Sequence, residues 1–351
     1  FLFASAEYYR KSYPNIYTPA NGTYEVEKMK LSKPVDINGV QHEYLDAEVA
    51  QAVIDKYSST YNPGAGFAES FGQHQVNDRS INAMLRLDWN INDRNKMMLR
   101  YQLMDAYADK YGSGSSSYYF NNSSYRMKDQ TNTVVFELNS RPSDNVSNEF
   151  RATAVIVRDK RDIPYAGANM YIKDKVYVNL GTEYSSGANS MNSDTYTIED
   201  NVSIFAGNHN ITLGTHNEIY RFNNLFLQYA YGGYTFNSLA DFFADKCSQF
   251  NYRYADPEVE GVNGPRWAAT TIAAQFGLYA QDEWKPTRDF TLTYGLRMDI
   301  PVLLNNPTAN EGFNATEISA NSGEKVGVVP KATPLFSPRI GFRWWMDKEH
   351  K

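Results

Sequence analysis

The sequence predicts an all-β chain that forms part of an antiparallel transmembrane β-barrel, and three observations support this. First, residues 290–300 alternate apolar with polar or small side chains, so one face of a strand there is apolar and the other polar. Second, short and long connections alternate along the chain, as in barrels with short periplasmic turns and long extracellular loops. Third, aromatic residues make up 15% of the 351 residues and include 27 tyrosines, which strands and membrane interfaces favour.

The same alternation recurs along the chain and predicts about ten strands. An alternating run of about eleven residues is long enough to cross a bilayer at a tilt. The pattern is clearest around Leu85, Leu99, Phe276, Leu292 and Phe342. We expect strands near residues 1–10, 81–91, 97–104, 130–139, 146–158, 193–205, 210–222, 272–280, 290–300 and 339–346.

The connections between these strands are of two kinds. Short polar segments rich in turn-forming residues lie at 92–95, 140–144, 207–209 and 285–289. Long segments lie near 11–80, 106–129, 159–192, 223–270 and 301–335. Such long loops would count against a compact soluble domain and favour a membrane barrel.

Two of the long segments carry a helical pattern. Residues 48–57 place Val49, Val53 and Tyr57 four residues apart, and residues 239–246 bring Leu239 close to Phe242 and its neighbour Phe243. We expect both short helices to pack against neighbouring loops.

Composition excludes several classes of site. The net charge of −6 gives no basic footprint, so we expect no nucleic-acid partner. The single Cys247 excludes an internal disulfide and a site with several thiolates. An acidic segment at 256–260 lacks the ordered ligand pattern of a calcium loop. We expect no catalytic constellation, no metal and no cofactor, because the histidines show no ligand spacing: they are His42, His74, His209, His216 and His350.

Two adjacent motifs carry a family resemblance. The segment FGLYAQDEWKP at residues 276–286, followed by LTYGLR at 292–297, resembles the barrel of TonB-dependent outer-membrane receptors. Further matches are NAMLRLDWN at 82–90, FNSLADFF at 236–243 and FSPRIGF at 336–342. Together they resemble the Oar-like branch of Bacteroidota, whose members carry a carboxypeptidase-regulatory-like domain, and the resemblance covers essentially the whole chain.

The resemblance implies a 22-stranded barrel of the Gram-negative outer membrane, with a plug domain and an N-terminal segment that contacts TonB. No plug-like segment or TonB box is found in this sequence, so residues 1–351 are expected to be a partial barrel domain of about ten strands. The implied partners are membrane lipid or lipopolysaccharide and the TonB complex, reached through the missing N-terminal part. A surface lipoprotein is left open, and the substrate is an unidentified small molecule, glycan or peptide.

Candidate functional residues fall into two groups. The first is expected to point into the barrel and to pair with a plug, with direct substrate contact as the alternative; its main candidates are Arg86, Asp88, Arg100, Gln102, Arg297, Asp299, Arg339 and Arg343. The same inward row is expected to include Glu137, Arg151 and Gln275. The second is a set of extracellular-loop aromatic residues that would meet substrate first: Tyr118, Tyr119, Tyr229, Tyr231 and Tyr234.

Three functions remain open on this sequence. The first is TonB-dependent uptake of a scarce nutrient, glycan or peptide. The second is a structural or adhesive surface protein whose barrel displays loops or supports a complex. The third is a soluble carbohydrate-binding β-protein, which purification without detergent as a monomer would favour.

Overall fold

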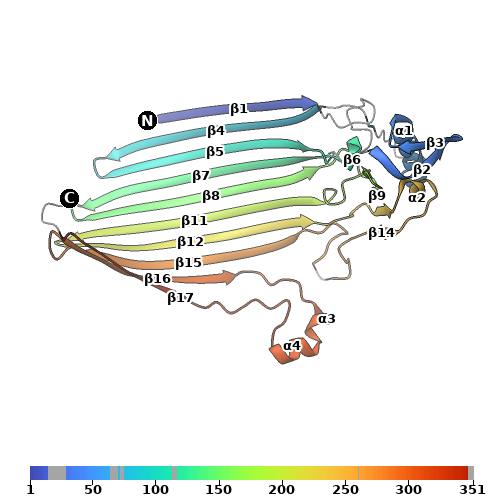
Figure 1. Ribbon diagram of the computed structural model, residues 1–351. Helices are drawn as coiled ribbons and strands as arrows, with labels where there is room; N and C mark the ends of the chain where they lie inside the picture. Colours follow the sequence, from blue (N-terminus) through green and yellow to red (C-terminus); the bar gives the residue numbers. More distant parts are fainter. Residues whose placement is uncertain (15–28, 64–69, 72–74, 113–116, 260, 347–351) are drawn as a thin grey trace.

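The long strands form one ten-stranded antiparallel sheet, in the order β1-β4-β5-β7-β8-β11-β12-β15-β16-β17 (Figure 1). The computed structural model describes residues 1–14, 29–63, 70–71, 75–112, 117–259 and 261–346. The sheet confirms the predicted fold class and includes a strand in each predicted segment. The ten strands are β1 Leu2–Pro14, β4 Gln75–Asn92, β5 Asn95–Lys110, β7 Tyr125–Ser143, β8 Val146–Asp162, β11 Asn189–Ala206, β12 His209–Phe226, β15 Ala269–Trp284, β16 Phe290–Leu303 and β17 Leu335–Trp344.

The predicted turns connect neighbouring strands at one end of the sheet (Figure 1). The breaks between β4 and β5, β7 and β8, β11 and β12, and β15 and β16 fall at the four predicted short segments. The ten strands follow one another in the sheet in the same order as in the chain, and each is antiparallel to the next. The long loops therefore leave from the opposite end of the sheet. The sheet is therefore an up-and-down meander with short turns at one end and long loops at the other, as the pattern of connections predicts.

The sheet has two chemically different faces. Residues that lie directly opposite each other on paired strands share a face of the sheet. The register places Leu85 opposite Tyr101 and Phe276 opposite Ile300, so the two residues of each pair lie on the same face. This apolar face stays uncovered: Leu85 is 49% exposed, Phe276 42% and Phe342 74%. The opposite face is polar, because it carries the charged side chains that alternate with the apolar ones along each strand. No second layer covers the apolar face within the described part of the chain, as expected when lipid covers it.

The height of the apolar face matches a bilayer. On β4 it runs from Ile91 near the short turn to Ile81. These ten residue steps span about 34 Å along the strand, or about 26 Å at a typical barrel tilt, close to the ~25 Å apolar band of outer-membrane barrels. Strands β4 to β12 continue beyond this band toward the long loops. Among the described residues, no helix is long and apolar enough to cross a membrane.

Four long loops fold together into a compact unit at the far end of the sheet, here called the loop module (Figure 1). The first loop contributes a hairpin whose Asn38-Gly39 turn has positive φ at both residues (55° and 87°), as a tight hairpin turn requires. A five-stranded sheet, in the order β14-β13-β9-β10-β6, joins segments of the other three loops. The elements are β2 Lys30–Ile37, β3 Val40–Tyr44, α1 Ala47–Lys56, a π-helical turn Tyr57–Tyr61, β6 Ser117–Tyr119, a 3₁₀ turn Asn121–Ser123, β9 Asn169–Lys173, β10 Tyr177–Leu180, β13 Gly233–Phe236, α2 Leu239–Phe243 and β14 Gln249–Asn251.

The hydrophobic core of the described chain lies in the loop module and not in the sheet. Its centre is formed by Tyr57, Phe120, Ile172, Phe236 and Phe242, each 0% exposed. Helices α1 and α2 both contribute to it, which confirms that the two predicted helices pack against neighbouring loops. Burial of these side chains from water drives the module together.

Polar contacts connect the loops around this core. Buried Asp174 accepts hydrogen bonds from the backbone N–H of Ser32 in the first loop (2.5 Å) and of Leu239 at the start of α2 (2.9 Å). The Tyr57 hydroxyl donates to the carbonyl of Ala168 at 2.8 Å. The last long loop is separate and forms two short helices, α3 Glu311–Asn314 and α4 Glu317–Ser322.

Candidate functional site

The eight candidate residues of the sheet all lie on the polar face. Register places Arg86 directly opposite Arg100, and places Gly295 opposite Arg339. Alternation within each strand then puts the remaining candidates on the same side. They form two groups near opposite edges of the sheet, β4–β5 and β16–β17, so the structure does not bring all eight together.

Within each group, one arginine binds a carboxylate two residues away on its own strand. Arg86 Nη2 lies 2.8 Å from Asp88 Oδ1, and Arg297 Nε lies 2.8 Å from Asp299 Oδ2. Asp299 also accepts a hydrogen bond from Gln275 Nε2 at 3.1 Å. These contacts join side chains of the same strand or of adjacent strands. All of these side chains lie on the polar face of the sheet.

A larger charged cluster occupies the middle of the polar face and is centred on Arg151 of β8. Its guanidinium lies 3.0 Å from Glu137 on β7, 2.9 Å from Glu149 and 3.5 Å from Glu199 on β11. We call this cluster, with His216 and Glu218 of β12, the inner network. One arginine thus joins three neighbouring strands through three carboxylates.

His216 extends the inner network to β12. Its Nδ1 lies 2.6 Å from Glu199 Oε1, and its Nε2 lies 3.5 Å from Glu218 Oε2. The network therefore holds four carboxylates around one guanidinium and one imidazole, and its charge is negative. The sequence candidates did not include Glu149, Glu199, His216 or Glu218. For Glu199, His216 and Glu218, the alternation with Ile198, Leu213 and Ile219 on the same strands was the signal that could have found them.

An aromatic ring covers a glycine beside the inner network. Gly214 of β12 lies directly opposite Tyr279 of β15, and a Cβ on Gly214 would collide with the Tyr279 ring. The Tyr279 hydroxyl donates to Asn201 Oδ1 at 2.5 Å, and the Arg297 guanidinium lies 5.4 Å from the ring centroid. The ring thereby lies between Asn201 of β11, the strand that carries Glu199, and Arg297 of β16. A cavity of about 370 Å³ between Tyr279, Arg297 and Arg339 marks this junction.

The loop tyrosines lie in the loop module and differ in accessibility. Tyr118 is 1% exposed and donates its hydroxyl to the carbonyl of Phe71 at 2.9 Å, so it is a core residue. The ring of Tyr229 lies 5.4 Å from that of Tyr184, and the ring of Tyr231 lies 4.0 Å from the Arg266 guanidinium. Burial raises the pKa of Tyr119 and Tyr229. Tyr234 packs on Tyr61 and Phe250 at 5.2 Å and 4.7 Å.

Two ionisable contacts stabilise α1 of the module. Asp46 accepts a hydrogen bond from the N–H of Val49 at 2.9 Å and therefore caps the helix. Its other carboxylate oxygen lies 2.8 Å from His42 Nδ1, and this hydrogen bond raises the pKa of His42. At the other end, Lys56 Nζ lies 2.8 Å from Asp245, and this contact lowers the pKa of Asp245.

Within the residues that the structure describes, no group of three or more His, Cys, Asp or Glu side chains could hold a metal ion. His74 and His350 lie outside the described residues.

Comparison with known proteins identifies the architecture. A family model described as "Outer membrane beta barrel domain" matches residues 4–350. Among curated proteins no sequence match is found. Among solved structures, the outer membrane transporter YddB from Escherichia coli is similar with a TM-score of 0.51 and 14% identity, over 78% of this chain and 30% of that one.

Two further solved structures show weaker similarity. The ferric-catecholate import receptor Fiu from E. coli has a TM-score of 0.43 and 13% identity, over 76% of this chain and 43% of that one. BauA, the ferric preacinetobactin receptor from Acinetobacter baumannii, has a TM-score of 0.46 and 10% identity, over 79% and 40%. The chain thus spans between 30% and 43% of the length of these three solved structures.

Proposed function

The chain belongs to the outer membrane beta barrel domain family and resides in the Gram-negative outer membrane, and from this premise we propose that it is part of the wall of a TonB-dependent transporter or receptor. Residues 1–351 would form one portion of a larger, 22-stranded barrel. The full protein would take up a scarce nutrient, glycan or peptide. The energy would come from the proton-motive force through the TonB complex.

The observation that carries this proposal is the inner network on the polar face. Glu137, Glu149 and Glu199 share a single arginine, so the middle of the face keeps unbalanced negative charge. Arg339 and Arg343, in contrast, lie on the polar face of β17 at the edge of the sheet. A barrel whose interior carries separate acidic and basic regions suits a folded plug with complementary charges. A small barrel filled by its own side chains would not need such an arrangement.

An uptake measurement on the full-length parent protein tests this proposal. Cells that produce the protein are grown in a defined medium, and depletion of each compound is followed by mass spectrometry. We expect at least one compound to be depleted only when both the protein and TonB are present, and a protonophore to abolish the depletion. Depletion that does not depend on TonB, or none, would contradict the proposal.

The second candidate is a structural or adhesive surface protein, and the loop module favours it. A module with its own buried core presents a fixed surface, as a display scaffold requires. In the same cells, a scaffold would change surface attachment or complex assembly without any TonB-dependent depletion. Replacement of the loop module by short turns would then abolish attachment.

We further propose membership of the Oar-like branch, which rests on the sequence motifs alone. The protein sequence that precedes Phe1 in the parent gene tests it. A carboxypeptidase-regulatory-like domain followed by a plug supports the assignment, and a plug without that domain contradicts it. A surface lipoprotein that covers the loops would be found by purification from native outer membranes.

A further inference from the structure

A patch of polar side chains interrupts the apolar face of the sheet on β8, β11 and β12. Register places Asn217 of β12 opposite Ile198 on one side and opposite Phe276 on the other, so Asn217 lies on the outward, apolar face. Alternation along β11 and β12 places Asp200 and Thr215 on the same face. We call four residues the outward polar patch: Asn148, Asp200, Thr215 and Asn217.

The outward polar patch lies inside the apolar band and not at its edge. Toward the long loops, the outward residues of β11 next to Asp200 are Ile198 and Tyr196. Toward the short turn they are Val202 and Ile204. Four residue steps separate Asp200 from Ile204, which is about 10 Å of depth at a typical barrel tilt. An ionised carboxylate at this depth is unfavourable unless it has a partner.

The residues around Asp200 do not neutralise its charge. Asn148 Nδ2 donates a hydrogen bond to Asp200 Oδ1. The Asn217 amide donates to the Thr215 hydroxyl at 2.8 Å, and that hydroxyl donates to the carbonyl of Gly277 at 2.8 Å. The neighbours of Asp200 on this face, along its strand, directly opposite and on the diagonals, include no Lys, Arg or His: they are Asn148, Phe150, Ala152, Ile198, Val202, Leu213, Thr215 and Asn217.

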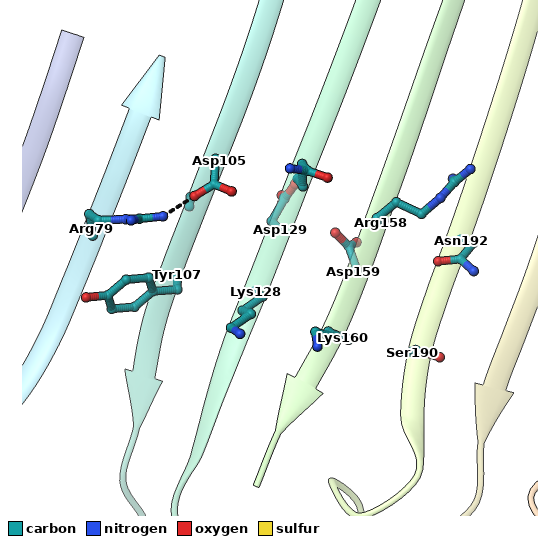
Figure 2. A pocket seen from close by; sticks show the side chains of 12 residues that line it. Arg79, Asp105, Tyr107, Lys128, Asp129, Arg158, Asp159, Lys160, Ser190 and Asn192 are labelled. Atoms are coloured by element: carbon teal, nitrogen blue, oxygen red, sulfur yellow. Dashed lines mark hydrogen bonds and ion pairs between the residues drawn. The ribbon is translucent and has the colours of Figure 1, made fainter. Parts of the chain in front are cut away.

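Every other outward carboxylate of the described strands contacts a basic side chain. The pairs are Asp105 with Arg79, Asp109 with Arg126, Asp162 with Lys128 and Lys160, Asp194 with Arg158, and Asp282 with His209. Figure 2 shows the first pair, Arg79 with Asp105. These carboxylates lie toward the ends of their strands. Within the described strands, Asp200 is thus the outward carboxylate that lies in the middle of the band and pairs only with an amide.

The missing cation has to come from another molecule. The sheet has five strands on one side of β11 and four on the other, so further strands of the barrel wall would join at β1 and β17 and leave the outward face of β11 open. Lipid acyl chains at this depth carry no charge. A second copy does not fit, because the outward Lys and Arg residues of the described strands all lie toward the long loops: they are Arg10, Arg79, Arg126, Lys128, Arg158, Lys160 and Arg221.

We propose that the outward polar patch is the contact site for a membrane-spanning segment of a different outer-membrane protein, and that this segment carries a Lys or Arg side chain at the depth of Asp200. The basic group would bind the Asp200 carboxylate away from water, where a charge-assisted hydrogen bond is strong. Leu213 and Ile219 flank the patch, are 44% and 41% exposed, and would pack on the same segment. The contact is on the outside of the barrel, so it does not depend on what the interior carries.

Site-specific photo-cross-linking in native outer membranes tests this proposal. The full-length protein is produced with p-benzoylphenylalanine in place of Leu213, and after irradiation the cross-linked peptides are sequenced by mass spectrometry. We expect an adduct with one membrane protein whose linked segment contains a Lys or Arg residue. The matched control carries the same probe in place of Leu85, which is 49% exposed on the distant strand β4, and it should not form this adduct.

Substitutions at Asp200 test the role of the charge. Asp200→Asn keeps the shape of the side chain, and the adduct should decrease at least about tenfold because a charge pair in a nonpolar environment is lost. Asp282→Asn is the matched control, because Asp282 already contacts His209 within the chain, and it should leave the adduct unchanged. Asp200→Lys should abolish the adduct, and replacement of the partner protein's basic residue by Asp should restore it.

Several results would overturn the proposal. They are adducts with lipid alone, with a second copy of this chain, or with a segment that lacks Lys and Arg, and an equal adduct in Asp200→Asn. If the Asp200 variants fail to fold by heat-modifiable gel migration, the basic residue of the partner protein is replaced by Gln and this chain stays wild type. Loss of the adduct then supports the proposal, and an unchanged adduct overturns it.

Discussion

The ten-stranded sheet and the loop module belong to one chain but are stabilised by different interactions. In the described sheet only three apolar residues, Val76, Val135 and Ala274, fall below a tenth of their full exposure. The loop module contains a continuous core of twenty buried residues. The sheet depends on backbone hydrogen bonds between strands and on lipid around its apolar face. The module depends on removal of apolar side chains from water.

This difference predicts that each part responds to a different kind of substitution. A truncated core side chain weakens the loop module, while the sheet is insensitive to it. A charge placed on the apolar face weakens the sheet in lipid, while the module is insensitive to it. The following predictions test this separation, and all refer to the full-length protein.

The largest effect is expected for Phe242→Ala in the core of the module. The Phe242 ring packs on Phe236 at 5.3 Å and on Tyr61 at 5.8 Å, so its loss should cost about 3–5 kcal/mol of module stability. Limited proteolysis should then cleave the long loops rapidly, while heat-modifiable gel migration of the barrel stays unchanged. The control is Phe250→Ala, because Phe250 is 55% exposed and should cost about 1 kcal/mol or less.

The next effect is expected for Leu85→Arg on the apolar face. A charge near the middle of the bilayer should cost about 2–4 kcal/mol, measured by urea titration of folding into lipid vesicles. Met84→Arg, one position along the same strand, points to the polar face and should change stability by less than about 1 kcal/mol. Equal losses at both positions would mean that the two faces of β4 do not differ in environment.

A smaller effect is expected for Asp174→Ala at the junction of the loops. The substitution leaves the buried N–H group of Leu239 and the partly buried N–H group of Ser32 without this acceptor, which should cost about 2 kcal/mol. Hydrogen exchange should accelerate at these two amides and in α2, and not in β4 to β12. Unchanged exchange at Leu239 would contradict the assigned role of Asp174.

The smallest effect is a pH dependence from His42. Because its folded pKa is raised above the ordinary value of 6.5, its contribution to module stability is complete below that value. The contribution is lost as pH rises through the raised folded pKa. Protease resistance of the module should therefore decrease slightly over this window in the wild type. The slope should disappear in His42→Gln, and an unchanged slope in that variant would assign it to another group.

The sheet could be predicted from sequence because each strand repeats a two-residue pattern over many positions. Residues 290–300 show this pattern without interruption, residues 81–91 break it only at Met84, and the short turns between strands are rich in turn formers. The inner network was only partly predicted. Glu199 and His216 lie on strands with weaker alternation, and only the register brings them beside Arg151.

The loop module could not be predicted from local pattern. Strands β9 and β13 have five and four residues, and they pair in parallel across loops that are far apart in sequence. No short window of sequence carries that information.

Accessibility of spin labels along β4 tests most directly the claim that lipid covers one face of the sheet and the barrel interior lies on the other. Single cysteines from position 84 to 89 would be labelled in the Cys247→Ser background, in full-length protein reconstituted in lipid vesicles. We expect labels at Leu85, Leu87 and Trp89 to be relaxed by dissolved oxygen and not by a water-soluble nickel complex. Labels at Met84, Arg86 and Asp88 should not show this preference for oxygen. Uniform protection of the apolar positions from both reagents would place them in a dry protein interior and contradict the account.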